Sequence, residues 1–117
     1  MFEIKLKDQT IPLKWGIWSI KRFTEISNKG LKEYFEILGN GEFPIEVIIW
    51  MLQAGAEYGY IKSNKEVDFS EVDICEWIDE CGGINGEQIR GFFEYMVSTV
   101  VSNVTTVNED KKKVKKS

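Results

Sequence analysis

Three sets of residues in this chain have types and spacings that could support chemistry: an acidic stretch, a glycine-rich loop and a pair of cysteines. In the acidic stretch, Glu76, Asp79 and Glu80 are spaced three or four apart, so they share one face of a predicted helix. Such a face could in principle hold a hard cation, but a calcium loop needs alternating oxygen ligands around a central glycine. The stretch has no such loop, so we expect a solvated helix face and no metal site.

The glycine-rich loop, Gly-Gly-Ile-Asn-Gly over residues 82–86, precedes a helix-forming stretch, as a phosphate-binding loop would. It follows a predicted helix rather than a strand, however, and no Lys-Ser or Lys-Thr pair follows Gly86. The end of one helix and the cap of the next account for all five residues. We therefore expect neither a nucleotide nor any other cofactor.

The two cysteines, Cys75 and Cys81, are six residues apart on one predicted helix, about 240° apart around its axis and about 9 Å apart along it. A disulfide cannot span that separation, so we expect free thiols in a reducing compartment. The chain contains no histidine, which excludes Ser-His and Cys-His pairs and zinc sites with imidazole ligands. The sequence therefore predicts no catalytic residues and a protein that is not an enzyme.

The composition predicts one folded domain with an acidic body. Of the 117 residues, 43% are hydrophobic and 13% aromatic, which is enough for a single core. The net charge is −4, but residues 108–117 carry +3, which leaves −7 for the rest and argues against nucleic acid as the main partner. The start of the sequence does not resemble a secretory signal, and the longest apolar run is too short to cross a bilayer. We expect a cytoplasmic protein without membrane contact.

Residues 1–15 predict a β-hairpin. A turn at residues 8–9 separates two stretches in which polar and apolar residues alternate. Pro12 cannot donate a ladder hydrogen bond, which favours an edge position for the second strand. A lone hairpin is marginal in water, so it must lie on the helices or on the strands of another subunit. The apolar residues are Phe2, Ile4, Leu6, Ile11, Leu13 and Trp15.

Helical periodicity dominates the remainder, so we expect an α+β, mostly α fold with about five helices. The central helix, residues 44–62, is apolar nearly all round and so predicted to be buried, with Pro44 as its first residue and small residues that let another backbone approach. The other helices are predicted over 17–27, 31–38, 71–81 with a Ser70–Asp73 capping box, and from Asn85 with Gln88 as its capping partner. The last helix repeats Ile89, Phe92, Phe93, Met96, Val97, Val100 and Val101.

These elements predict a single globular domain over residues 1–103, with the hairpin at 1–15 and the helical body at 16–103. Residues 104–117 turn to Thr, Val, Asn and then lysines, and a disordered charged tail is expected there.

The aromatic residues predict a protein-binding role. Four tryptophans exceed what so small a core needs, and tryptophan is enriched where protein partners bind. The alternative interpretation, that these rings belong to the core or its edge, stays open. The residues expected to contact a partner are Trp15, Trp18, Phe43, Trp50 and Trp77.

The opening Phe-Glu-Ile-Lys-Leu-Lys-Asp-Gln-Thr-Ile-Pro-Leu-Lys-Trp-Gly leads into an amphipathic helix, and Leu-Gln-Ala-Gly-Ala-Glu-Tyr lies in the apolar helix. Together with the late amphipathic helix and the charged tail, this pattern resembles the tail assembly chaperones of long-tailed bacteriophages and prophages, over roughly residues 1–101. The resemblance implies a non-enzymatic protein of the bacterial host cytoplasm. It also implies binding to the helical tape measure protein, recruitment of tail tube protein, and a frameshifted longer form.

Three further expectations remain open. Hairpins joining edge to edge would make a homo-oligomer. The lysine-rich residues 111–116 would suit a nucleic-acid-associated phage or regulatory protein. A structural head or tail completion protein is a third alternative.

Overall fold

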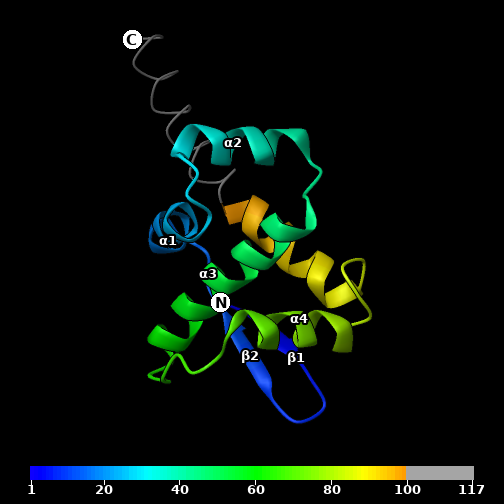
Figure 1. The fold of residues 1–117 in the computed structure, drawn as a ribbon. Coiled ribbons are helices and arrows are strands. Elements are labelled where there is room, and N and C mark those ends of the chain that lie inside the picture. The colour runs from blue at the N-terminus through cyan, green and yellow to red at the C-terminus, as the bar shows by residue number, and fades with distance from the viewer. Residues whose placement is uncertain (100–117) are drawn as a thin grey trace, which may run out of the picture.

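The structure, a computed structural model, describes residues 1–99. It confirms the predicted α+β, mostly helical fold: an antiparallel hairpin precedes five helices within this range. The hairpin and α2 lie at opposite ends of the molecule, with α3 between them (Figure 1). The elements are β1 (Phe2–Lys5), β2 (Thr10–Leu13), α1 (Ile17–Ser27), α2 (Leu31–Asn40), α3 (Ile45–Lys62), α4 (Glu71–Glu80) and a last helix described over 87–99. Val100, Val101 and the predicted tail at 104–117 lie outside the described residues.

The central helix α3 is buried as predicted, with most residues from Val47 to Tyr60 inaccessible to water. Pro44 is its N-cap rather than its first helical residue, with an extended ψ of 154°. The fixed φ of proline suits both the N-cap and the first helical position. The predicted start of the helix therefore differs from the observed start by one residue.

The small residues of α3 let the hairpin lie directly on the helix. A Cβ at Gly59 would collide with the backbone carbonyl of Pro12, so only glycine allows this approach. Next to it, the backbone N–H of Lys14 donates a hydrogen bond of 3.0 Å to the carbonyl oxygen of Gly55. A Cβ at Gly55 would in turn press on the ring of Phe92 in the last helix. The hairpin therefore packs on helices of its own chain, one of the two arrangements expected.

The outer edge of β1 and the turn that follows it are held by the side chains of Gln88 and Glu80. The side-chain amide of Gln88 accepts from the N–H of Lys5 at 2.6 Å and donates to its carbonyl oxygen at 2.9 Å. A carboxylate oxygen of Glu80 accepts from the N–H of Lys7 at 2.6 Å. These contacts occupy main-chain groups that pairing between two hairpins would need.

The predicted cap of the last helix is wrong. The helix begins at residue 87, so Asn85 lies before the N-cap position and Gln88 is not its capping partner. The reason is that the Gln88 amide bonds to the β1 edge instead. The capping box of α4 is confirmed, with Ser70 and Asp73 each accepting from the other's backbone N–H.

Candidate functional site

Two of the five residues predicted to contact a partner lie in the core. Trp15 is buried, and its Nε1 donates a hydrogen bond of 2.9 Å to the hydroxyl oxygen of buried Tyr34. Trp77 is also buried and packs on the ring of Phe69, with centroids 5.0 Å apart. Both indoles therefore pack within the fold and do not present a binding surface.

The other three predicted residues are half-buried, and each packs on a different ring. Trp18 stacks on Tyr58 at a centroid distance of 5.3 Å, and Trp50 meets Phe23 edge-on at 6.5 Å. Phe43 stacks on Phe93 at 5.1 Å. The structure thus distributes these rings over separate places and does not bring them together in one aromatic site.

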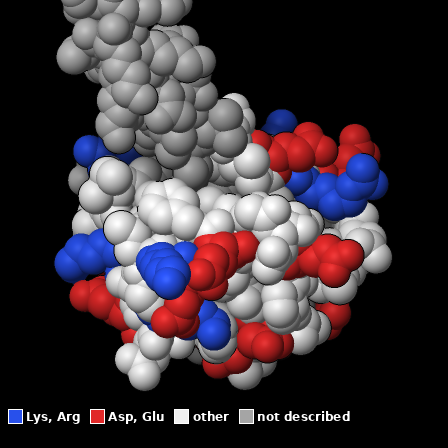
Figure 2. Space-filling model, turned by 90° about the horizontal axis from the view of Figure 1, so that it is seen from above, with Lys and Arg blue, Asp and Glu red and all other residues white. Residues whose placement is uncertain are grey.

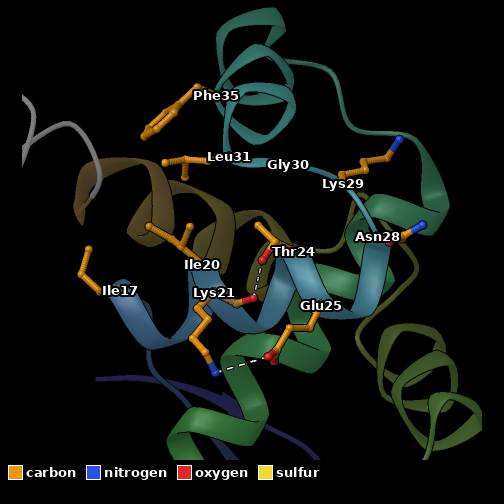
Figure 3. Close-up of a pocket in the computed structure, with 10 residues that line it drawn as sticks. All are labelled: Ile17, Ile20, Lys21, Thr24, Glu25, Asn28, Lys29, Gly30, Leu31 and Phe35. Atoms are coloured by element: carbon orange, nitrogen blue, oxygen red, sulfur yellow. Dashed lines mark hydrogen bonds and ion pairs between the residues drawn. The ribbon is translucent and has the colours of Figure 1, made fainter.

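An apolar surface lies elsewhere, in a groove between α1 and α2 with a volume of about 740 Å³. Figure 3 shows aliphatic and aromatic side chains from both helices around this space. Three of them are largely exposed: Ile17 at 77%, Leu31 at 54% and Phe35 at 43%. We call this surface the α1–α2 groove. Its lining residues are Ile17, Ile20, Lys21, Thr24, Glu25, Asn28, Lys29, Gly30, Leu31 and Phe35.

The groove exists because α1 uses a different face for the core. Ser19 and Phe23 point inward, and the Ser19 hydroxyl donates to the carbonyl oxygen of Lys14 at 2.7 Å. Ile17, Ile20 and Thr24 follow one another at intervals of three and four residues, so they form a second stripe beside the buried one. This second stripe faces α2.

On the other side of the groove, α2 packs on the core through Tyr34, Ile37 and Leu38. Tyr34 is its only fully buried side chain, and its ring packs on Phe23 at 5.5 Å. Burial raises the pKa of Tyr34 to about 12, although the hydrogen bond from Trp15 partly opposes the shift. Tyr34 points into the core, whereas Leu31 and Phe35 of the same helix line the groove and remain exposed.

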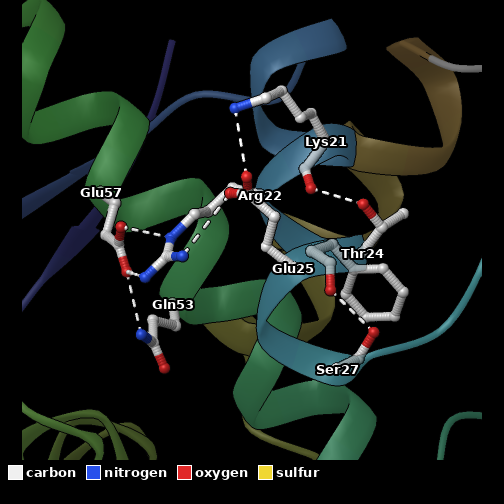
Figure 4. A network of polar contacts seen from close by, with 8 residues as sticks. Lys21, Arg22, Thr24, Glu25, Ser27, Gln53 and Glu57 are labelled. Carbon is white, nitrogen blue, oxygen red and sulfur yellow. Dashed lines mark hydrogen bonds and ion pairs between the residues drawn. The ribbon is translucent and has the colours of Figure 1, made fainter.

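A polar network fixes α1 to α3 behind the groove (Figure 4). Arg22 Nε donates a hydrogen bond of 2.8 Å to Glu57, a nearly buried carboxylate, and Gln53 donates to the same carboxylate at 2.9 Å. The hydrogen bond to Glu57 is the main cause that raises the pKa of Arg22, and burial opposes it. Glu25 forms ion pairs with both Arg22, at 3.6 Å, and Lys21, at 3.3 Å.

A second apolar depression, of about 530 Å³, lies at the other end of α2. The depression is lined by Leu38, Gly41, Phe43, Phe93, Glu94, Val97 and Ser98. Phe43 is the only one of the five predicted residues that lines either of these apolar sites.

Seen from the side of α2, basic and acidic residues are interspersed around uncharged surface (Figure 2).

The described residues offer little for metal or acid–base chemistry. Within residues 1–99, no cluster of three or more Cys, Asp or Glu side chains is arranged to hold a metal ion. Cys75 and Cys81 are free thiols, as predicted. Burial, and next the charge of Glu80, raise the pKa of Cys81, which disfavours the reactive thiolate. No described helix combines the length and the apolar character needed to cross a bilayer.

Sequence reasoning missed the groove because it looked for aromatic residues. The available signal was aliphatic: Ile17 and Leu31 are the first residues of their helices, where a side chain has no preceding turn to pack on. Their spacing is in the sequence, but their exposure depends on how α1 and α2 are placed relative to each other.

A scan against protein-family models, a search of curated proteins and a search of solved structures each gave no significant match. The α1–α2 groove and the side chains that line it are therefore the observations from which a function is proposed.

Proposed function

We propose that this protein is a phage tail assembly chaperone that holds a helical segment of the tape measure protein in the α1–α2 groove. It works in the cytoplasm of the bacterial host and catalyses no reaction. The observation that carries the proposal is the gathering of Ile17, Leu31 and Phe35 at one groove. Single exposed hydrophobic residues are ordinary on a protein surface, whereas a contiguous group of them is typical of a binding site.

The dimensions of the groove suit a helical client. Its α1 side runs from Ile17 to Asn28, eleven residue steps and thus about 16 Å, or roughly three helical turns. An amphipathic helix bound in a groove uses apolar side chains at positions i, i+3, i+4 and i+7, which span about two turns. The groove would thereby shield from water the apolar stripe of a long helical protein that has not yet been assembled.

A co-purification experiment tests this function. The full chain, tagged, is co-expressed with the tape measure protein encoded in the same genome, and we expect the two to purify together. An Ile17→Asp/Leu31→Asp variant should lose the tape measure protein, because two carboxylates then lie at the groove. Both positions are exposed first residues of helices, where Asp is favourable, so the variant should still fold.

Val72→Asp is the matched control. Val72 is 64% exposed and lies in the first turn of α4, outside the groove, so this variant should retain the tape measure protein. Failure of the wild-type chain to co-purify with the tape measure protein would contradict the proposed function. The nucleic-acid alternative depends on residues 111–116, which lie outside the described residues, and no described feature favours it.

A further inference from the structure

We propose that Asn40 is a site of spontaneous deamidation in the folded protein, whereas Asn85, in the same dipeptide sequence, is protected. The chain contains two Asn-Gly pairs, Asn40-Gly41 and Asn85-Gly86. Deamidation begins when the backbone nitrogen of the next residue attacks the asparagine side chain, and glycine allows this approach because it carries no Cβ. Both pairs therefore have a suitable sequence, and only their structural surroundings distinguish them.

The reaction at Asn40 needs water as its only co-reactant. The backbone nitrogen of Gly41 attacks Cγ of Asn40, a new N–Cγ bond forms, and the Cγ–Nδ2 bond breaks as ammonia leaves with the proton of the attacking amide. Water then opens the cyclic imide at one of its two carbonyls. Opening at Cγ gives aspartate, and opening at the main-chain carbonyl gives isoaspartate. Either way a neutral side-chain amide is replaced by a carboxylate.

Asn40 lies at a helix end that offers little resistance to this attack. It is the exposed last residue of α2 and stands between Gly39 and Gly41, so the final turn has a low helix propensity. The C-cap residues of α3 and α4 donate their N–H groups to carbonyl oxygens of the last turn, but Gly41 makes no such hydrogen bond within residues 1–99. Its nitrogen is therefore available as the nucleophile.

The backbone on both sides of Asn40 also has room to rotate. No other part of the described chain comes within 4 Å of a Cβ built at Gly39 or at Gly41. Residues 41–44 form neither helix nor strand, and Figure 1 shows this link between α2 and α3 at the outside of the molecule. The Gly41 nitrogen can thus turn towards the side chain of Asn40 without displacing a neighbour.

Asn85 is exposed as well, but the glycine that follows it is held in place. The N–H of Gly86 donates a hydrogen bond of 3.0 Å to the carbonyl oxygen of Gly83, and its own carbonyl oxygen accepts from the N–H of Arg90 at 3.0 Å. A Cβ at Gly86 would collide with the carbonyl oxygen of Cys81. Attack on Asn85 therefore requires the Gly86 nitrogen to leave its hydrogen bond and turn within a closely packed backbone.

Deamidation at Asn40 would weaken the end of α2. The new carboxylate lies at the C-terminus of the helix, where the macrodipole is also negative, and the last turn contains no basic residue to offset it. Isoaspartate would in addition lengthen the main chain where α2 ends. The adjoining Gly41 lines the second apolar depression together with Phe43, so a negative charge would appear beside that surface.

The test compares the two asparagines in the full-length protein, incubated in mildly alkaline buffer both folded and unfolded in urea. Mass spectrometry of proteolytic peptides detects the loss of each amide, and enzymatic methylation detects isoaspartate. In the folded protein we expect Asn40 to react about tenfold faster than Asn85 or more, because attack at Asn85 must first break a hydrogen bond in a packed loop. In urea the two rates should become similar.

Asn40→Gln should abolish the fast reaction, because a glutamine side chain would have to close a larger ring. Asn85→Gln is the matched control and should leave the fast reaction unchanged; both positions are exposed, so both variants should fold. The proposal would be overturned by equal rates at the two sites in the folded protein, by a faster reaction at Asn85, or by an Asn40 that reacts only in urea. A ratio of rates that urea leaves unchanged would also overturn it, because the structure would then play no part.

Discussion

The backbone of Gly59 in α3 lies against the carbonyl group of Pro12 in β2, so closely that a Cβ at position 59 would overlap this carbonyl. This contact seats the hairpin on the central helix. It also explains why the small residues of α3 are needed where they stand: the helix carries no side chain at the point where a strand crosses it.

Replacement of Gly59 by Ala should therefore destabilise the protein although Ala is the better helix former. We expect a loss of about 2–4 kcal/mol in the free energy of unfolding, because backbone must move to admit the methyl group. The measurement is urea unfolding followed by circular dichroism. Gly39→Ala is the control: Gly39 is in α2, nothing lies within 4 Å of an added Cβ, and a gain of about 0.5–1 kcal/mol is expected.

The burial of the Tyr34 phenol predicts an alkaline loss of stability. Tyr34 has a pKa of about 12 in the folded protein, against 10.0 as its ordinary value. Because the folded pKa is the higher one, this contribution is complete below pH 10 and is lost as the pH rises from 10 towards 12. Its size is on the order of 2–3 kcal/mol.

Tyr34→Phe should cost about 1–3 kcal/mol near pH 7, because the indole N–H of Trp15 loses its partner. The difference from wild type should shrink as the pH rises from about 10 towards about 12, since the variant has no phenol to titrate at this position. Urea unfolding of both proteins across this range provides the measurement. A constant difference would show that Tyr34 does not titrate as described.

The pairing of Arg22 with Glu57 predicts that two neighbouring cations on α1 differ in importance. Arg22→Leu leaves the nearly buried carboxylate of Glu57 with Gln53 alone, and we expect a loss of about 1–3 kcal/mol. Lys21→Leu removes only an exposed pair with Glu25 and should change stability by less than about 0.5 kcal/mol. Thermal unfolding compares the two variants, and equal losses would contradict the assignment.

The contact between Gln88 and Lys5 predicts local protection of the β1 edge. Gln88→Ala should speed hydrogen–deuterium exchange of the Lys5 amide and cost about 1–2 kcal/mol of stability. Gln9→Ala removes an exposed glutamine side chain from the hairpin turn and should leave that amide protected. Similar exchange at Lys5 in both variants would refute a role for Gln88.

Local signals in the sequence were sufficient for most of the fold. Helix α1 runs from Ile17 to Ser27 as predicted, because Gly16 precedes it and Asn28, which adopts a left-handed φ of 58°, ends it. The capping box at Ser70 likewise placed the start of α4. Both signals act within a few residues, so no knowledge of the tertiary structure was needed.

The misplaced cap and the unrecognised groove depend on long-range packing. Gln88 is paired with a residue 83 positions away, and no local pattern contains that partner. The burial of Trp15 depends on α2 and the last helix packing over it, through Tyr34 and Phe92. The exposure of Ile17 depends in the same way on where α2 lies, which periodicity within one helix does not specify.

The most direct test of the central claim is an NMR titration of the isotope-labelled full chain with the tape measure protein segment that co-purifies with it. We predict that chemical-shift changes concentrate on Ile17, Ile20, Leu31 and Phe35, with the hairpin and α4 little affected. Changes concentrated on the hairpin or α4, with those four residues unmoved, would contradict binding in the α1–α2 groove.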